Sequence, residues 1–166
     1  METHNNRVAP SPIEPRNCIG EFDAGLNQFT LHTSSQGVHR IRSLLATNVL
    51  KIPQNKLRVV TPDVGGGFGV KLWLYPEHVL VLLAARMYKR PIKWLATRGE
   101  SFLADHHGRD VLTRGEMALD NSGRILALRI DNIANIGAYP SYFGPFIPTA
   151  GGTRIAAGPY DIKDIH

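Results

Sequence analysis

The sequence contains a single cysteine, no long apolar run and no apolar leader. Cys18 stands alone among 166 residues, so the chain can form neither an internal disulfide nor a cysteine cluster for zinc or iron–sulfur centres. The longest apolar run, Val79 to Ala85, is far shorter than the ~20 residues that cross a bilayer. The polar start of the chain does not resemble a signal peptide. These absences predict a cytoplasmic protein without a membrane span.

Histidine spacings typical of metal sites and dense runs of basic residues are also absent. The seven histidines form no HxxxH or HExxH pattern, and His106 and His107 are adjacent, so they cannot face one ion as an i, i+4 pair would. No Ser-His-Asp or Cys-His arrangement can be assigned from spacing. The net charge is +5, but the basic residues are scattered. We therefore expect no nucleic-acid partner, and a basic nucleic-acid-binding domain is the least favoured alternative.

The sequence does contain enough apolar residues, 43% of the chain, for a domain with a hydrophobic core. Prolines within residues 1–17 predict an extended lead-in, and residues 18–166 are expected to form the domain. Short β-rich segments predict four strands, at 18–23, 28–33, 57–61 and 92–97. A strong turn signal at 120–123 predicts a hairpin of 110–119 with 124–132.

Two helices are predicted. Ser34 and Ser35 are favourable N-caps for the first helix. Its apolar face consists of Val38, Ile41, Leu45 and Val49. The second helix begins at Pro76 and is apolar on nearly all sides, so we expect it to be buried. Together these elements predict an α+β fold with a mixed β-sheet and helices packed on one face. Residues 139–159 are expected to form a long irregular loop that is functional or covered by a partner.

The sharpest local feature is the glycine-rich segment Gly65 to Lys71, between a predicted strand and a predicted helix. Its four glycines allow positive φ, so that successive N–H groups can converge on an anion or oxo group. The segment is not a P-loop, because Leu72 follows the lysine, and it lacks the dinucleotide fingerprint, because Val70 occupies the last glycine position. On pattern alone, a tight loop against a neighbouring strand is favoured over a ligand-binding loop.

Gln36 is the second candidate, at the start of the first predicted helix. Its side-chain amide offers both donors and an acceptor to a ligand. Taken alone, the segment Ser34 to Gly37 is more simply explained as a helix cap. From the residues alone, the chain is therefore an α+β domain with a glycine-rich loop that can face an anion or a cofactor.

Several segments resemble, in the same order, the large subunit of molybdenum hydroxylases, the family of xanthine dehydrogenase, aldehyde oxidase and carbon monoxide dehydrogenase. The resemblance covers almost the whole chain, and the ordered combination is more specific than any single segment. The matching segments are 7–16 (RVAPSPIEPR), 35–37 (SQG), 65–71 (GGGFGVK), 98–102 with Arg109 and the hairpin, 136–139 and 158–162. The resemblance implies a molybdenum cofactor-binding domain fold, here as an incomplete part of a larger domain.

The resemblance also implies a cofactor and the residues that face it. In this family a pterin dithiolene holds molybdenum, as molybdopterin or its cytosine dinucleotide form. By resemblance, the Gln36 side chain hydrogen-bonds an oxo ligand of molybdenum, and backbone N–H groups of Gly66, Gly67 and Phe68 face the metal and its pterin. No residue of the chain is expected to ligate the metal directly. No glutamate of the chain matches the family's general base, so no catalytic residue is assigned.

The function implied by the resemblance is that of a molybdenum-dependent oxidoreductase, a hydroxylase of aldehydes, carbon monoxide or similar small substrates with water as the oxygen source. Leu72 stands where purine-oxidising members carry an acidic residue, which disfavours a purine. Electrons would leave through iron–sulfur and flavin subunits, and turnover is expected to require a complementing large-subunit segment. The alternative is a non-catalytic scaffold or interaction module that retains the fold, including as a homo-oligomer. The substrate, the nucleotide form of the pterin and the presence of copper stay open.

Overall fold

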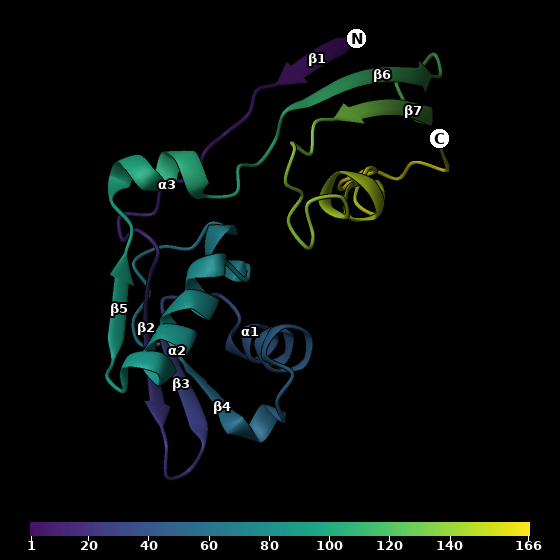
Figure 1. Ribbon diagram of the computed structural model, residues 1–166. Helices are drawn as coiled ribbons and strands as arrows, with labels where there is room; N and C mark the ends of the chain where they lie inside the picture. The colour runs from purple at the N-terminus through teal and green to yellow at the C-terminus, as the bar shows by residue number, and fades with distance from the viewer. The chain divides into compact units, whose positions relative to one another are not determined.

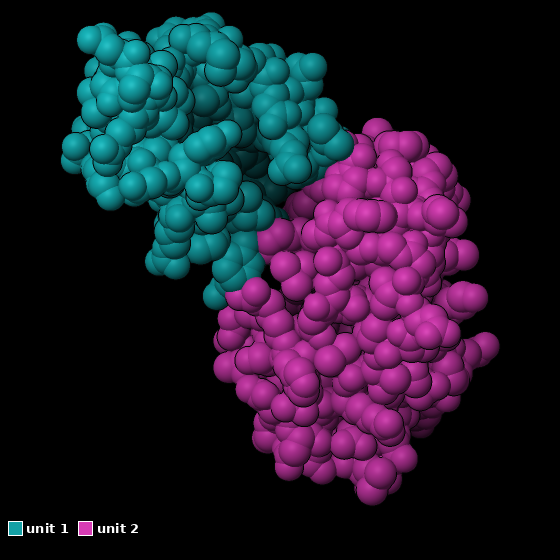
Figure 2. Space-filling model, turned by 180° about the vertical axis from the view of Figure 1, so that it is seen from behind, with its two compact units in different colours: residues 1–8, 107–166 teal, residues 9–106 magenta.

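The computed structural model describes residues 1–166 and divides them into two compact units, shown in different colours in Figure 2. Unit 1 combines residues 1–8 with residues 107–166, and unit 2 is the continuous stretch 9–106. The division into a lead-in over 1–17 and a domain over 18–166 follows different boundaries and stays a prediction.

Unit 2 is built on a four-stranded mixed sheet with the strand order β4-β3-β2-β5 (Figure 1). Its strands are β2 (Asn17–Asp23), β3 (Gln28–Thr33), β4 (Leu57–Val60) and β5 (Ile92–Leu95), and all four were predicted. β2 pairs antiparallel with β3 and β5, whereas β3 and β4 are parallel. Along β3, Phe29, Leu31 and Thr33 are buried and the residues between them are not. Because successive strand side chains point to opposite faces, this alternation confirms that one face is covered.

Helix α2 (Pro76–Tyr88) packs across β2 and begins with the predicted proline in its first turn (Figure 1). Val81, Leu82 and Ala85 point into the core, but Leu80 is 62% exposed and Met87 is 74% exposed. The expectation that this helix is buried on all sides was therefore wrong. It lies on a single sheet, so only the side facing the strands is covered within unit 2.

The first helix differs from its prediction at both ends. α1 (Val38–Ser43) begins after Gly37, and Ser35 Oγ accepts a hydrogen bond from the Gly37 N–H instead of capping the helix. The chain then widens into the π-helical segment Leu44–Leu50, in which each turn takes more residues than in an α-helix. The 3.6-residue spacing consequently fails at Val49, which is 42% exposed, while Ile41 and Leu45 are buried as expected.

The remaining elements of unit 2 are short. They are the 3₁₀ turns Gln54–Lys56 and Val70–Leu72 and helix α3 (Arg98–Ala104). In α3, Thr97 and Glu100 form a capping box: the Thr97 Oγ1 accepts from the Glu100 N–H, and the Glu100 carboxylate accepts from the Thr97 N–H.

Unit 1 contains a second four-stranded sheet with the order β1-β6-β7-β8. The strands are β1 (Glu2–Asn5), β6 (Val111–Leu119), β7 (Ile125–Ala134) and β8 (Asp164–Ile165), and β6 and β7 form the predicted hairpin. The expected irregular loop over 139–159 consists mainly of turns and includes the π-helical segment Ile147–Gly151. None of the helices combines the length and apolar character that a bilayer crossing requires. The expected cytoplasmic location stays a prediction.

Gly20→Ala is expected to lower the free energy of unfolding of unit 2 by about 1–3 kcal/mol. A Cβ at Gly20 would lie 2.5 Å from the carbonyl carbon and oxygen of Val81 in the backbone of α2, so the helix would have to move away from β2. Trp73 and Trp94, the two tryptophans of the chain, both belong to unit 2. Tryptophan fluorescence during urea unfolding therefore measures this effect.

Gly99→Ala is the matched control, because a Cβ there meets nothing closer than Thr97 Oγ1 at 4.0 Å. Gly99 lies in helix α3, where alanine is the better helix former, so its substitution should not destabilise the unit. Equal losses of stability in the two variants would contradict the close packing of β2 on α2.

Candidate functional site

The structure brings the Gln36 side chain against the glycine-rich loop. Gln36 Oε1 accepts hydrogen bonds from the backbone N–H of Gly69 at 3.0 Å and of Lys71 at 3.2 Å. The Gln36 backbone N–H in turn donates to the Lys71 carbonyl at 3.1 Å. A Cβ added at Gly67 would overlap the Gln36 side chain, so this glycine is what permits the close approach. The two segments singled out in the sequence therefore form one local structure.

These contacts determine which way the Gln36 amide is turned. Two N–H groups point at the same side-chain atom, and only the oxygen can accept from both, because the amide nitrogen carries two hydrogens of its own. Nε2 makes no hydrogen bond within the chain, and the residue is exposed. Gln36 thus offers a ligand two N–H donors and keeps its acceptor for the loop.

The three central residues of the loop add further donors. The backbone N–H groups of Gly66, Gly67 and Phe68 donate no hydrogen bond within the chain. Gly66 and Phe68 have positive φ, 94° and 52°, and the Phe68 side chain is 74% exposed. Three consecutive unpaired N–H groups beside a free amide NH₂ make a neutral, donor-rich surface of the kind that binds anions and oxo groups.

A groove of about 600 Å³ adjoins Gln36. Residues 35–39, from the start of α1, and residues 58–61, from the end of β4, line it. Arg58 and His39 are the lining residues that can carry positive charge, and none of the lining residues is acidic. The groove therefore suits a neutral or anionic ligand.

The carboxylate of Glu14 anchors both ends of the glycine-rich loop. Glu14 Oε2 accepts from Lys71 Nζ at 2.7 Å, Ser34 Oγ at 2.7 Å and the Gly65 N–H at 2.8 Å, and Oε1 accepts from Asn17 Nδ2 at 2.9 Å. Burial raises the pKa of Glu14, but these four donors outweigh it and lower the pKa to about 2. The carboxylate is therefore ionised in the folded chain, and the stability it contributes above about pH 4.5 is lost as the pH falls towards 2.

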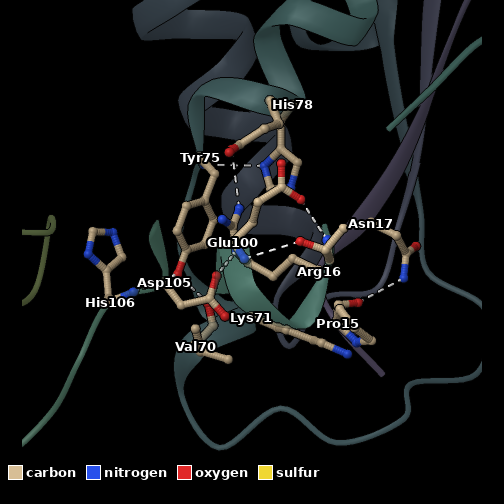
Figure 3. Close-up of polar contacts among 12 residues, drawn as sticks. Pro15, Arg16, Asn17, Val70, Lys71, Tyr75, His78, Glu100, Asp105 and His106 are labelled. Carbon is tan, nitrogen blue, oxygen red and sulfur yellow. Dashed lines mark hydrogen bonds and ion pairs between the residues drawn. The ribbon is translucent and has the colours of Figure 1, made fainter. Parts of the chain in front are cut away.

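A buried cluster around Arg16 holds the elements that follow the loop (Figure 3). Arg16 is 4% exposed and donates to Asp105 and to Glu77, which lie at the end of α3 and in the first turn of α2. Its guanidinium lies 3.6 Å from the centre of the Tyr75 ring, and the Tyr75 hydroxyl donates to the Val70 carbonyl. The end of the glycine loop is consequently tied to this cluster.

His78 is a neutral member of the same cluster (Figure 3). Its Nδ1 accepts from the Tyr75 N–H, and its Nε2 lies 3.3 Å from Thr33 Oγ1, which itself donates to the Asn17 carbonyl. Nε2 therefore carries the proton. Burial, helped by the positive charge of Arg16, lowers the pKa of His78 to about 4.

The sequence-based predictions assigned no function to Glu14 or Arg16. In the structure, Glu14 contacts the glycine loop directly, and Arg16 packs on Tyr75, which is hydrogen-bonded to the loop's end. Their segment was expected only to be extended, because Pro10, Pro12 and Pro15 exclude a helix. The one signal in the sequence is that charged residues flank Pro15 within a segment of the family resemblance. That signal does not say which cation or anion each residue meets.

The whole chain, residues 1–166, matches the family model of the molybdopterin cofactor-binding domain. It is 36% identical over 160 residues to the carbon monoxide dehydrogenase large chain of Hydrogenophaga pseudoflava, covering 96% of this chain and 20% of that one. It is 36% identical over 116 residues to the aldehyde oxidoreductase molybdenum-binding subunit PaoC of Escherichia coli (strain K12), covering 70% of this chain and 15% of that one.

Among solved structures, quinoline 2-oxidoreductase from Pseudomonas putida 86 is similar over 99% of this chain and 22% of its own, with a TM-score of 0.89 and 30% identity. The expected family and fold are thereby confirmed. The chain spans about a fifth or less of the length of the curated relatives named here.

Gly67→Val is expected to push the Gln36 side chain away from the loop, because the new side chain would occupy its place. The N–H groups of Gly69 and Lys71 would then lose their acceptor, and their hydrogen exchange should become on the order of tenfold faster. Gly108→Val is the control, since a Cβ there has no atom within 4 Å. Unchanged exchange at Gly69 and Lys71 would show that Gln36 and Gly67 are not in contact.

His78 should make unit 2 sensitive to mild acid. A histidine whose folded pKa, about 4, lies below its ordinary value of 6.5 binds a proton more tightly when unfolded, so stability is lost as the pH falls from about 6.5 to 4. The slope in this window should approach ~1.4 kcal/mol per pH unit. His78→Gln retains an acceptor for the Tyr75 N–H and should flatten the slope, whereas His39→Gln, at an exposed position, should leave it unchanged. Urea unfolding at several pH values measures both.

Proposed function

The chain belongs to the molybdopterin cofactor-binding domain family, and on this premise we propose that it forms part of a molybdenum–pterin site in the large subunit of a molybdenum hydroxylase. The observation that carries the proposal is the set of unpaired donors. Gln36 Nε2 and the N–H groups of Gly66, Gly67 and Phe68 lie on two segments that are hydrogen-bonded to each other. All four belong to residues assigned to the cofactor by the family resemblance.

The chemistry of these donors fits a metal-oxo group. Such a group bears negative charge, and neutral donors held in place by the fold stabilise it without neutralising it. When bound, the cofactor would supply the oxidation of a carbon centre with oxygen taken from water. The residues of this chain would orient the cofactor: Gln36 would donate to an oxo ligand, and the loop backbone would face the metal and its pterin. Molybdopterin and its cytosine dinucleotide form both remain candidates.

We propose an aldehyde, carbon monoxide or a similar small molecule as the substrate. The names of the two relatives, a carbon monoxide dehydrogenase and an aldehyde oxidoreductase, support this class. Leu72 argues against a purine, because purine-oxidising members carry an acid at that position. We further propose that turnover requires a complementing large-subunit segment with the catalytic base, and iron–sulfur and flavin subunits that accept the electrons.

A second candidate is a non-catalytic interaction module, including a homo-oligomer. The observation that favours it is the apolar side of α2 that unit 2 leaves uncovered, with Leu80 62% exposed and Met87 74% exposed. This candidate predicts a stable self-association without uptake of molybdenum. The hydroxylase proposal predicts molybdenum in the complex with the complementing segment.

Gln36→Glu tests the hydroxylase proposal in the chain co-expressed with the complementing segment. The glutamate keeps an oxygen for the Gly69 and Lys71 N–H groups but replaces the outward NH₂ donor with a second oxygen. We expect molybdenum per complex, or turnover of the loaded complex, to fall roughly 10–100-fold with the fold unchanged. Gln54→Glu adds the same charge at an exposed position away from the groove and should have no effect.

Unchanged molybdenum content and turnover in Gln36→Glu would refute the assignment of Gln36 as a donor to the cofactor. Dye-linked oxidation of an aldehyde or of carbon monoxide by the purified chain alone would refute the need for a complementing segment. A homo-oligomer that binds no molybdenum under any of these conditions would favour the interaction module.

A further inference from the structure

Glu14 joins three segments that are distant in the sequence. Its carboxylate accepts from Ser34, two residues before Gln36, and from both ends of the glycine loop, Gly65 and Lys71. The Glu14 backbone N–H also donates to the Gly65 carbonyl at 3.1 Å. One side chain therefore sets the spacing between the start of the first helix and the loop that faces it.

Lys71 connects this anchor directly to Gln36. The Lys71 side chain is 0% exposed, and Glu14 is the acidic residue with which it forms an ion pair. The Lys71 backbone meanwhile holds Gln36 at two points, with its N–H donating to Oε1 and its carbonyl accepting from the Gln36 N–H. Any shift of Lys71 would consequently be transmitted to the Gln36 amide.

We propose that Glu14 and Lys71 are positioning residues: their ion pair holds the loop so that the Gln36 oxygen stays on the Gly69 and Lys71 N–H groups and its NH₂ group remains available to a ligand. The identity of that ligand rests on the proposed function, but the orientation of the amide does not. Neither residue touches the ligand in this proposal. Both act through the backbone of the loop.

The physical reason is that an ammonium group cut off from water must keep a partner. Removing the carboxylate leaves an uncompensated buried charge, which is far more costly than removing both members of the pair. Lys71 would then move towards water and carry its own backbone with it. The loop would lose the geometry in which two N–H groups point at one side-chain oxygen.

The experiment measures the Gln36 amide without the cofactor, by NMR of the chain labelled with ¹⁵N, with the Gln36 side-chain signals identified from their loss in Gln36→Ala. In Glu14→Gln and in Lys71→Met we expect the Gln36 NH₂ signals to shift towards free-glutamine values and to lose their ordered relaxation. Hydrogen exchange at the Gly69 and Lys71 amides should become on the order of tenfold faster. Amides at the centre of β3, such as Leu31, should change less than these two.

Glu21→Gln is the matched control, because it removes a carboxylate from β2 that is 46% exposed and pairs with His32 instead of with the loop. It should leave the Gln36 signals unchanged. If Glu14→Gln does not fold, Lys71→Met decides alone, since the Glu14 carboxylate is 32% exposed and keeps its other donors. Ordered Gln36 signals in every folded variant would overturn the proposal.

The double variant Glu14→Gln/Lys71→Met separates positioning from general stabilisation. With no unpaired charge left, it should recover much of the stability lost in Glu14→Gln. If the pair positions the amide, the Gln36 NH₂ group stays disordered, as judged by its chemical shift and relaxation, even though stability has recovered. If order returns together with stability, the pair is merely structural and the proposal fails.

The positioning role and the proposed function can fail separately. An ordered Gln36 amide in the wild type, combined with unchanged molybdenum content in Gln36→Glu, would reject the proposed function and leave the positioning role standing.

Discussion

The carboxylate of Glu14, paired with Lys71 and hydrogen-bonded to three further donors, is the contact on which the site depends. Lys71 is fully enclosed, so its charge can be kept inside the protein only while a carboxylate meets it. The same oxygen also holds Ser34 and the Gly65 N–H, which brings the start of α1 and the loop to a common centre. The ion pair of Glu14 and Lys71 thus supports a loop surface without formal charge, because the groups left unpaired on the loop are backbone N–H donors.

Charged and neutral groups play different parts at the loop. The ion pairs of Glu14 and of Arg16 hold the loop and the elements that follow it. Gln36 and the N–H groups of Gly66, Gly67 and Phe68 present donors without a formal charge. This division suits a ligand whose charge has to change during a reaction, because fixed dipoles stabilise negative charge without forming an ion pair that must later be broken. His78, kept neutral by burial, follows the same pattern inside the unit.

Much of the fold could be predicted because its signals are local. The strands β2 and β3 follow from two short β-rich segments joined by a turn-like link, and the β6–β7 hairpin follows from the turn at 120–123. The errors lie where packing overrides a local pattern. Val49 has the spacing of a core residue in an α-helix, but the π-helical turns displace it to the surface. The apolar composition of α2 indicates that its side chains favour burial. It does not indicate how much of the helix surface the rest of this chain covers.

The sequence by itself determined six of the eight strands and the two segments that could face a cofactor, the glycine-rich loop and the segment around Gln36. Periodicity, glycine content and short motifs suffice for these because they are properties of neighbouring residues. Only the tertiary structure decided that the Gln36 oxygen is taken by the loop and that its nitrogen is free. It also decided that Glu14 meets Lys71, 57 residues along the chain. A charged residue in a sequence shows that a partner is needed once it is buried, but packing alone selects which distant group that partner is.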